Sequence, residues 1–328
     1  MFSNLFRLSV ISVFFTFFSF FNSSYISAQE NVTVSGYVKD QANGETLIGA
    51  TVYLKEIGKG ATTNVYGFYS ISVPPATYSI EVSYLGFNKL SLNVNLNENQ
   101  KLNLEMVEES SDIEEIVVVA EREDQNVTNN EISTQKLGIA TIQKMPALLG
   151  EVDIIRSIQL LPGVSTVGEG ATGFNVRGGS IDQNLVLLDE SPVYNSSHLF
   201  GFFSVFNPDA VKDVKLYKGG IPARYGGRLS SILDVRMKEG NNKNLSVKGG
   251  VGFIFSRLSV EAPFAKGKGS FIVAGRRSYI DILAKPFLDD DLSDTELNFY
   301  DLTFKTNYTI NDRNRVFFSG YNLSLIHI

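Results

Sequence analysis

The sequence predicts a multidomain protein in which a small all-β sandwich is followed by an α+β domain and by the first strands of an incomplete antiparallel transmembrane β-barrel. Three observations lead to this fold class. Short extended runs alternate with turns up to about residue 107, helical and strand periods mix between residues 126 and 238, and apolar and polar residues alternate along several later runs. Because the three regions have different hydrophobic periods, each predicts a different architecture.

The first 28 residues have the pattern of a secretory signal peptide. Arg7 precedes an apolar run over residues 8–21, and a site of small residues ends at Ala28, which is the order of parts in such a peptide. The apolar run is shorter than the roughly 20 residues that a membrane-spanning helix needs. We therefore expect export, with cleavage after Ala28.

Cysteine content and charge exclude several classes of protein. The 328 residues contain no cysteine, and their formal net charge is -6. An exported chain without cysteine is held together by burial rather than by disulfides, and Cys-based metal or redox chemistry is not open to it. Nucleic-acid binders concentrate Lys and Arg, whereas here they are spread thinly over an acidic chain. We expect no nucleic-acid partner.

Residues 29–107 predict the β-sandwich. Extended runs are separated by turn signals such as Asn43-Gly44 and Pro74-Pro75, and short strands with this spacing are typical of sandwiches. The expected strands cover residues 32–39, 50–54, 69–73, 78–84, 90–96 and 102–106.

A linker over residues 108–125 contains an unusual strand. Ile116, Val117, Val118 and Val119 are four successive β-branched residues, and their acidic and polar flanks offer nothing apolar for packing. Such residues favour an extended backbone, and an unpaired strand can add to the edge of a partner's sheet. The alternative is that this run is the first strand of the next domain.

Residues 126–238 predict the α+β domain. Leu148, Leu149, Val152, Ile155 and Ile158 fall at helical spacing before Pro162-Gly163, which predicts where that helix ends. The continuous apolar run over residues 185–188 predicts a strand that is covered on both faces. Asn207 before Pro208 predicts a helix N-terminus. In residues 233–238, apolar and charged residues alternate as in a strand.

Residues 239–328 predict the start of the barrel. Apolar and polar residues alternate over residues 244–256 and 302–310, and further extended runs lie over residues 258–262, 271–274 and 316–321. The connections over residues 263–269 and 311–314 are short, while the one near residues 279–298 is long. Outer-membrane barrels have short periplasmic turns and long external loops. A soluble sheet also alternates, and it is the competing interpretation.

Two resemblances to known families follow from linked motifs. Residues 36–40, 44–52 and 63–71 resemble the carboxypeptidase regulatory-like domain. The region after the linker is similar to the plug domain of TonB-dependent outer-membrane receptors of the Bacteroidota kind. The motifs that carry the second resemblance are Leu161-Pro162-Gly163-Val164, Phe174-Asn175-Val176-Arg177-Gly178-Gly179, the run from Asp182 to Asp189, Val214-Lys215-Leu216-Tyr217-Lys218-Gly219-Gly220 and Tyr225-Gly226-Gly227.

The receptor resemblance implies roles for particular residues. The segment Glu115, Ile116, Val117, Val118, Val119 and Ala120 is similar to the TonB box, which pairs with the energy-transducing protein TonB. The plug motifs assign structural positions to Arg177, Gly178, Gly179, Asp189, Gly219, Gly220, Tyr225, Gly226 and Gly227. The resemblance places the protein in the cell outer membrane, in contact with its lipid, with a periplasmic N-terminal domain.

The chain departs from the starch-utilisation (SusC-like) branch of this family at two places. That branch usually has an Asp-Gly pair where this chain has Asp189-Glu190, and its TonB box usually runs into Gly-Tyr-Gly where this chain has Ala120-Glu121-Arg122. Both departures argue against a SusD-like lipoprotein partner. A barrel of about 22 strands needs far more residues than 239–328 provide, so we expect an N-terminal fragment.

The sequence predicts an importer and not an enzyme. A zinc carboxypeptidase needs about three protein ligands for its metal, but the only histidines are His198 and His327. The glycines at 168, 170 and 173 match a dinucleotide fingerprint but lack its strand and helix context. We therefore expect no catalytic residue, metal or cofactor. The expected substrate is a scarce or bulky nutrient, such as a metal chelate, an oligosaccharide or a peptide. The alternative is a surface structural or adhesive β protein without transport.

Overall fold

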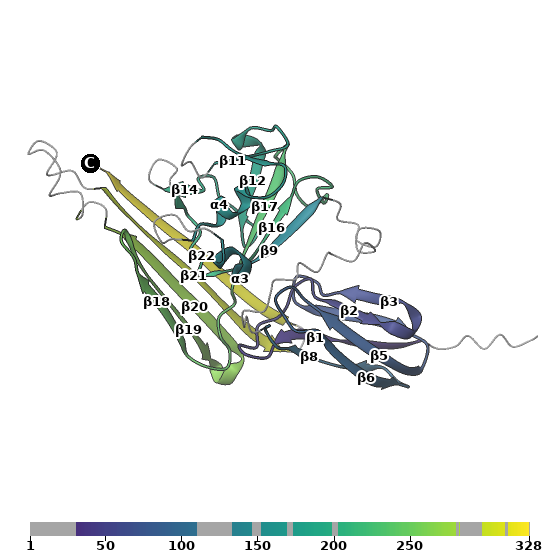
Figure 1. Cartoon of the computed structure of the whole chain (residues 1–328). Coiled ribbons are helices and arrows are strands. Elements are labelled where there is room, and N and C mark those ends of the chain that lie inside the picture. Colours follow the sequence, from purple (N-terminus) through teal and green to yellow (C-terminus); the bar gives the residue numbers. More distant parts are fainter. Residues whose placement is uncertain are drawn as a thin grey trace, which may run out of the picture.

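The computed structural model describes residues 31–109, 133–145, 152–168, 173–198, 203–279, 282, 297–311 and 314–327. A β-sandwich, an α+β domain and a long antiparallel sheet follow one another along the chain (Figure 1). The predicted signal peptide, residues 1–28, and the predicted TonB box, residues 115–120, lie outside the described residues. Within the described residues, no helix is long and apolar enough to cross a membrane.

Two four-stranded sheets form the sandwich. In the first, β1 (Val32–Asp40) pairs with β4 (Phe68–Val73), β7 (Gln100–Lys101) and β8 (Leu104–Met106). The second has the order β3 (Lys59–Thr62), β2 (Thr51–Leu54), β5 (Ala76–Ser83), β6 (Leu90–Leu96). The predicted strands are confirmed, and β3 and the two-residue β7 are additions. Gly60 lies in β3, where a Cβ would come 2.9 Å from the Val52 carbonyl oxygen, so the glycine serves a close approach of strands and not a turn.

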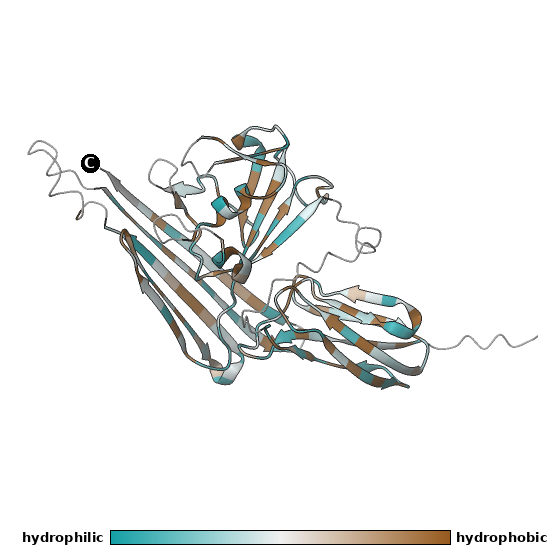
Figure 2. Cartoon of the chain, viewed as in Figure 1, coloured by the Kyte–Doolittle hydropathy of each residue, from teal (hydrophilic) through white to brown (hydrophobic). Residues whose placement is uncertain are grey.

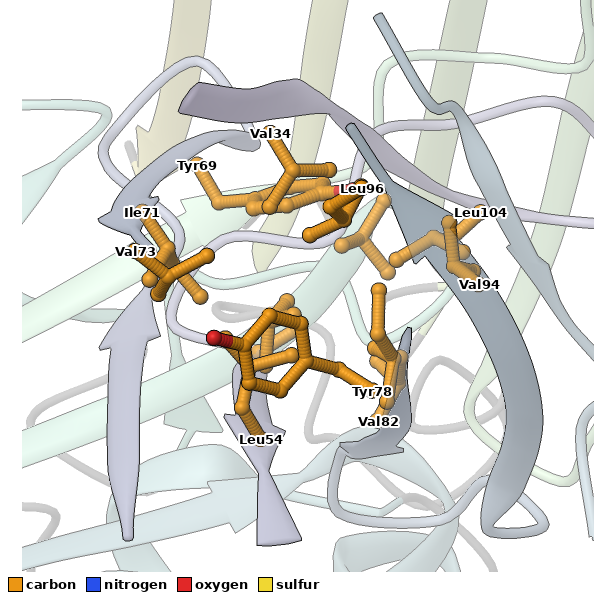
Figure 3. Packing of buried hydrophobic residues seen from close by; sticks show 14 of the residues in the cluster. Val34, Leu54, Tyr69, Ile71, Val73, Tyr78, Val82, Val94, Leu96 and Leu104 are labelled. Atoms are coloured by element: carbon orange, nitrogen blue, oxygen red, sulfur yellow. The ribbon is translucent and has the colours of Figure 1, made fainter. Parts of the chain in front are cut away.

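The sandwich has its own apolar core. Val34 of β1, Tyr69 and Ile71 of β4, and Leu96 of β6 meet between the sheets, each almost completely buried (Figure 3). The Tyr69 hydroxyl donates to the Leu102 carbonyl at 2.8 Å, which satisfies the polar end of a buried ring. Full burial of each such side chain contributes roughly 1.5–3 kcal/mol to folding.

The α+β domain is built on a five-stranded sheet. Its order is β13 (Ser191–Pro192), β12 (Asn184–Leu188), β17 (Ser231–Met237), β16 (Val211–Tyr217), β9 (Thr134–Gly138). Only β12 and β17 are parallel. Short elements complete the domain: α3 (Ile139–Gln143), α4 (Ile154–Gln159), β10 (Val164–Thr166), β11 (Phe174–Val176), η2 (Ile181–Gln183), β14 (Ser197–His198) and β15 (Phe203–Ser204).

Two helix predictions in this domain need correction. The helix predicted over residues 148–158 begins only after Asp153, whose side chain caps α4 by accepting from the Arg156 N–H at 3.1 Å; Leu148 and Leu149 lie outside the described residues. The helix predicted at Asn207 is wrong. Its Oδ1 accepts from the Asp209 N–H at 3.0 Å, which closes an Asx turn, and the chain then enters β16.

Five strands follow in sequential antiparallel order: β18 (Ser246–Val251), β19 (Phe255–Phe264), β20 (Gly269–Ser278), β21 (Leu297–Asn311) and β22 (Asn314–His327). The turn at η4 (Ala265–Gly267) and the link over residues 312–313 share one end of the sheet, since Gly269 pairs with Tyr308. We call this the short-turn end. At the opposite end of the sheet, β20 ends at Ser278 and β21 begins at Leu297.

The long sheet is apolar on its outer face and polar on its inner face. Leu302, Ile310 and Phe318 point outward and are 44%, 55% and 63% exposed, whereas Arg276, Asp301 and Asn307 are buried. In Figure 2, hydrophobic (brown) and hydrophilic (teal) residues follow one another along these strands. A soluble sheet buries its apolar face, while the wall of a membrane barrel turns that face to lipid. The barrel prediction is confirmed as the start of such a wall.

One detail of the barrel prediction is wrong. The alternation over residues 244–256 does not belong to one strand, because the chain reverses over residues 252–254 between β18 and β19. Val247 faces outward, whereas Phe255 is buried against Phe203 of the α+β domain, with ring centroids 4.6 Å apart. Apolar and polar residues alternate along both strands of this hairpin. The sequence pattern therefore shows no break at the turn.

Candidate functional site

Buried ion pairs hold the α+β domain against the polar face of the long sheet. Arg276 on β20 lies 2.8 Å from Asp301 on β21, and the same guanidinium donates to the Ser204 carbonyl of the α+β domain at 2.8 Å. Both charged residues are almost fully buried. Such a pair is tolerated when further hydrogen bonds satisfy its remaining groups. Here the additional bond is made to the α+β domain, so the pair also fixes that domain in place.

The Ser204 segment is held from its other side by Asp153. Its Oδ2 accepts from the Ser204 N–H at 2.6 Å, while Oδ1 caps α4. The carboxylate lies at a helix N-terminus, where negative charge is favoured. The backbone N–H of Ser204 is therefore bound by the α+β domain, and its backbone carbonyl is bound by the long sheet.

Asp189 makes a second junction between the two parts. Its Oδ2 lies 2.9 Å from the Lys305 ammonium on β21, and its Oδ1 accepts from the Met237 N–H at 3.0 Å. A third junction pairs Arg257 on β19 with Asp209 at 3.3 Å. The strand end that the sequence assigned to the plug motif is therefore a contact with the barrel wall.

The predicted motif residues Arg177, Gly178, Gly179, Gly219 and Gly220 come together beside the end of β16. Arg177 donates from NH2 to Ser133 Oγ at 2.9 Å, and a Cβ on Gly219 would lie 2.9 Å from Arg177 NH1. Gly178 and Gly220 have φ values of 81° and 59°, a region that other residues adopt only at a cost. Burial and the charge of Arg177 lower the pKa of the neighbouring Lys218.

Tyr225, Gly226 and Gly227 form a separate cluster beside β17. The Tyr225 hydroxyl donates to Asp234 Oδ2 at 3.2 Å and accepts from Arg224 NH2 at 3.2 Å. Burial, together with the negative charge of Asp234, raises the pKa of this hydroxyl. Gly227 has a φ of 81°. The nine predicted plug residues therefore occupy three places: the Arg177 turn, the Tyr225 turn and the Asp189 junction.

Apart from Asp189, the residues that hold the α+β domain and its Ser204 segment in place were not predicted from the sequence. Arg276, Lys305 and Asp153 lie 50 or more positions from their partners Ser204 and Asp189. The available signal was a charged residue at an inward position of an alternating strand, as for Lys305 between Phe304 and Thr306. That signal indicates a polar interior but does not name the partner.

The α+β domain also contains a half-open cavity of about 730 Å³. Its lining includes Asn175, Gly179, Asp182, Tyr194 and Arg228, so hydrogen-bonding groups lie beside an exposed aromatic ring. Pockets that bind small molecules combine these features. Within the described residues, no group of three or more His, Asp or Glu side chains could hold a metal ion, and the acidic run over residues 289–294 lies outside them.

The fold and these junctions define a class of protein. In this class, an amphipathic β-sheet forms part of a barrel wall, and its polar face holds a separate α+β domain. Residues 34–118 match the CarboxypepD_reg-like domain, and residues 127–231 match the TonB-dependent Receptor Plug Domain. The chain is a TonB-dependent receptor homologue with a CarboxypepD_reg-like domain ahead of its plug domain. Members of this family are outer-membrane receptors with a periplasmic N-terminal region, not enzymes.

Similar proteins include TonB-dependent receptor P3 of Formosa agariphila, which is 32% identical over 96 residues, or 29% of this chain and 9% of that protein. Among solved structures, the siderophore receptor PirA from Pseudomonas aeruginosa has a TM-score of 0.39 at 17% identity, covering 58% of this chain and 35% of that one. The outer membrane transporter YddB from Escherichia coli has a TM-score of 0.43 at 13% identity, covering 60% and 33%. The chain thus spans only a small part of these relatives.

Proposed function

We propose that the complete protein is a TonB-dependent importer that takes up a scarce or bulky nutrient: a metal chelate, an oligosaccharide or a peptide. The single observation that carries the proposal is the attachment of the plug domain to the polar face of an apolar-outward sheet through Arg276, Lys305 and Arg257. A domain held against a barrel wall by a few ion pairs and by small apolar clusters, such as Phe203 with Phe255, closes the pore and can still move when work is done on it. A surface adhesin has no use for such an arrangement.

The place where the linker enters the plug supports this mechanism. Ser133 leads directly into β9, which lies at one edge of the plug sheet and is joined to β16 by five residue pairs. The entry point is held by Arg177, which donates to Ser133 Oγ, and by the Lys218 N–H, which donates to the Ser133 carbonyl at 3.1 Å. A pull on the linker therefore acts first on an edge strand, whose removal breaks only one row of hydrogen bonds.

We propose that TonB binds Glu115, Ile116, Val117, Val118, Val119 and Ala120 by strand addition. β-augmentation uses main-chain hydrogen bonds. Several of these bonds bear the load together when the strand is pulled along its length. The proposed domain limits are residues 29–107 for the regulatory-like sandwich, 108–125 for the linker, 126–238 for the plug and 239–328 for the start of the barrel. The described sandwich supports the first limit, since β8 ends at Met106; the family match extends further, to residue 118.

The proposal is tested in a strain that lacks the native gene and carries the full-length receptor. Labelled ferric chelates, oligosaccharides and peptides are offered, and surface binding and accumulation are measured separately. Val118→Pro removes a main-chain donor from the proposed TonB strand, so we expect binding to remain and accumulation to be lost. Glu123→Pro, in the same linker but outside the strand, is the matched control and should accumulate normally. Equal accumulation by both variants would contradict the proposal.

A further inference from the structure

The loop between β1 and β2 of the sandwich reaches the junction of plug and barrel at the short-turn end. The Asn43 carbonyl accepts from the Asn242 N–H at 2.9 Å, and Asn242 Nδ2 donates to the Gly44 carbonyl at 3.3 Å. Lys243 Nζ donates to the Gln41 carbonyl at 2.6 Å. The approach is close enough that a Cβ on Gly44 would lie 2.0 Å from Asn242 Oδ1. The loop is therefore seated on the segment that connects the plug with β18.

A buried charge cluster lies beneath this loop and joins all three parts of the chain. Glu45 of the sandwich lies 2.9 Å from the Lys212 ammonium of the plug, and the same carboxylate accepts from the Glu239 N–H at 3.0 Å. The Glu239 carboxylate in turn lies 2.7 Å from Arg315 on β22. Glu45 and Glu239 are both nearly fully buried. Removing one partner would leave a buried charge uncompensated, so the sandwich, plug and barrel contacts depend on one another here.

A second contact binds the edge strand of the plug. Lys136 on β9 donates to the Tyr84 hydroxyl at 2.9 Å and to the Ile48 carbonyl at 3.3 Å, both in the sandwich. The Tyr84 hydroxyl donates to Asp213 on β16 at 3.2 Å, and Lys136 lies 3.4 Å from the same carboxylate. The sandwich therefore spans β9 and β16, the two strands that must separate if β9 is withdrawn.

The chemistry of this seat suits release as well as attachment. Within the described residues, the apolar core of the sandwich and that of the plug share no member, so the two domains meet through charged and polar groups. Domains joined in this way expose little apolar surface when they part, and their charges regain water. Separation of the sandwich requires no rearrangement of either core.

We propose that the sandwich is a releasable clasp: docked on Lys136, Lys212 and the Asn242 segment, it holds the plug edge strand β9 in place, and it must leave this seat before β9 can be withdrawn. The proposal rests on the proposed importer function, because it is the pull on the linker that the clasp opposes. It assigns the N-terminal domain an autoinhibitory role toward plug movement.

The first test locks the clasp with a disulfide. The 328 residues contain no cysteine, so Asn43→Cys with Asn242→Cys is introduced into a full-length receptor free of other cysteines. We expect the bond to form in the resting receptor and accumulation of the transported label to be lost while surface binding remains. A reductant should restore accumulation in the same double variant, which thus serves as its own control. Failure of the bond to form, or normal accumulation with the bond intact, would overturn the clasp.

The Val118→Pro variant distinguishes the two levels of the proposal. If it abolishes accumulation and the disulfide does not, the importer stands and the clasp falls. If it leaves accumulation intact, the importer mechanism itself is wrong, whatever the disulfide does, and the clasp that opposes its pull is wrong with it.

The second test opens the clasp sterically and does not depend on transport. Gly44→Ala places a methyl group against Asn242, while Gly49→Ala in the same loop meets open space; their φ values, 74° and 76°, impose the same backbone strain. Spin labels at Tyr66→Cys and Lys266→Cys report the distance from the sandwich to the short-turn end. We expect a longer or broader distance distribution with Gly44→Ala only. Identical distributions in the two variants would overturn the seat.

Discussion

In the turn between β12 and β13, Asp189 contacts the barrel wall, and its neighbour Glu190 has a strained backbone conformation. Asp189 and Glu190 have φ values of 46° and 69°, as in a type I′ hairpin turn, which favours Asn-Gly or Asp-Gly. Asp189 makes the junction with Lys305. Among the described residues, Glu190 pairs with Arg236 at 3.9 Å, and its side chain is 69% exposed; an exposed pair contributes little.

Replacing Glu190 by glycine is therefore expected to stabilise the receptor. A left-handed conformation costs a residue with a Cβ roughly 1–2 kcal/mol, and part of that gain is offset because glycine loses more backbone entropy on folding. We expect the net gain to be about 1 kcal/mol, measured as a higher urea midpoint of the full-length receptor in detergent. Glu190→Gln keeps the strain and removes the charge, and it should match the parent. A glycine variant no more stable than the glutamine variant would refute this explanation.

At the scale of elements, the sequence could predict those whose signal is local. The strands of the sandwich and the short turns of the barrel were predictable because period and turn residues lie within a few positions of each other. β3 was hidden by Gly58 and Gly60, since a glycine needed for close approach resembles a turn glycine. Asn207-Pro208 has the residues that start a helix. The chain instead enters β16 a few residues later, because Val211–Tyr217 pairs in the plug sheet and leaves no room for a helix. The partners of Arg276 and Lys305 were not predictable, because no local pattern links residues so far apart.

The outward face of β21 permits a prediction about depth in the membrane. Leu302 near the middle of the strand and Ile310 beside the short turn are similarly exposed, at 44% and 55%. An arginine on the lipid face costs about 2–4 kcal/mol at the bilayer midplane and about 0–1 kcal/mol near the interface. We expect Leu302→Arg to lower the stability of the full-length receptor folded into phospholipid vesicles far more than Ile310→Arg. Equal penalties would mean that this face does not cross the lipid as proposed.

At the scale of the whole molecule, the parts are joined by charges that the sequence separates widely. Glu45 and Lys212 belong to different domains, and Arg315 completes their cluster from the barrel. Although burial lowers the pKa of Lys212, the negative charges of Glu45, Glu239 and Asp213 raise it above its ordinary value of 10.5. The sum of several carboxylates around one ammonium outweighs the cost of its desolvation. Lys212 is thus a cation that docking of the sandwich stabilises.

The raised pKa of Lys212 predicts how docking depends on pH. A folded-state pKa above the ordinary value means that the contribution is fully present below 10.5 and is lost as the pH rises through the folded value. Nearby, burial lowers the pKa of Lys136, so this ammonium loses its charge at a lower pH than Lys212 does, and burial raises the pKa of Tyr84. We expect the spin-label distance between sandwich and barrel to lengthen above pH 10.5. Lys212→Arg should shift that change to higher pH, since guanidinium stays protonated there. Lys212→Met should abolish it; an unchanged profile in Lys212→Met would show that another group governs docking.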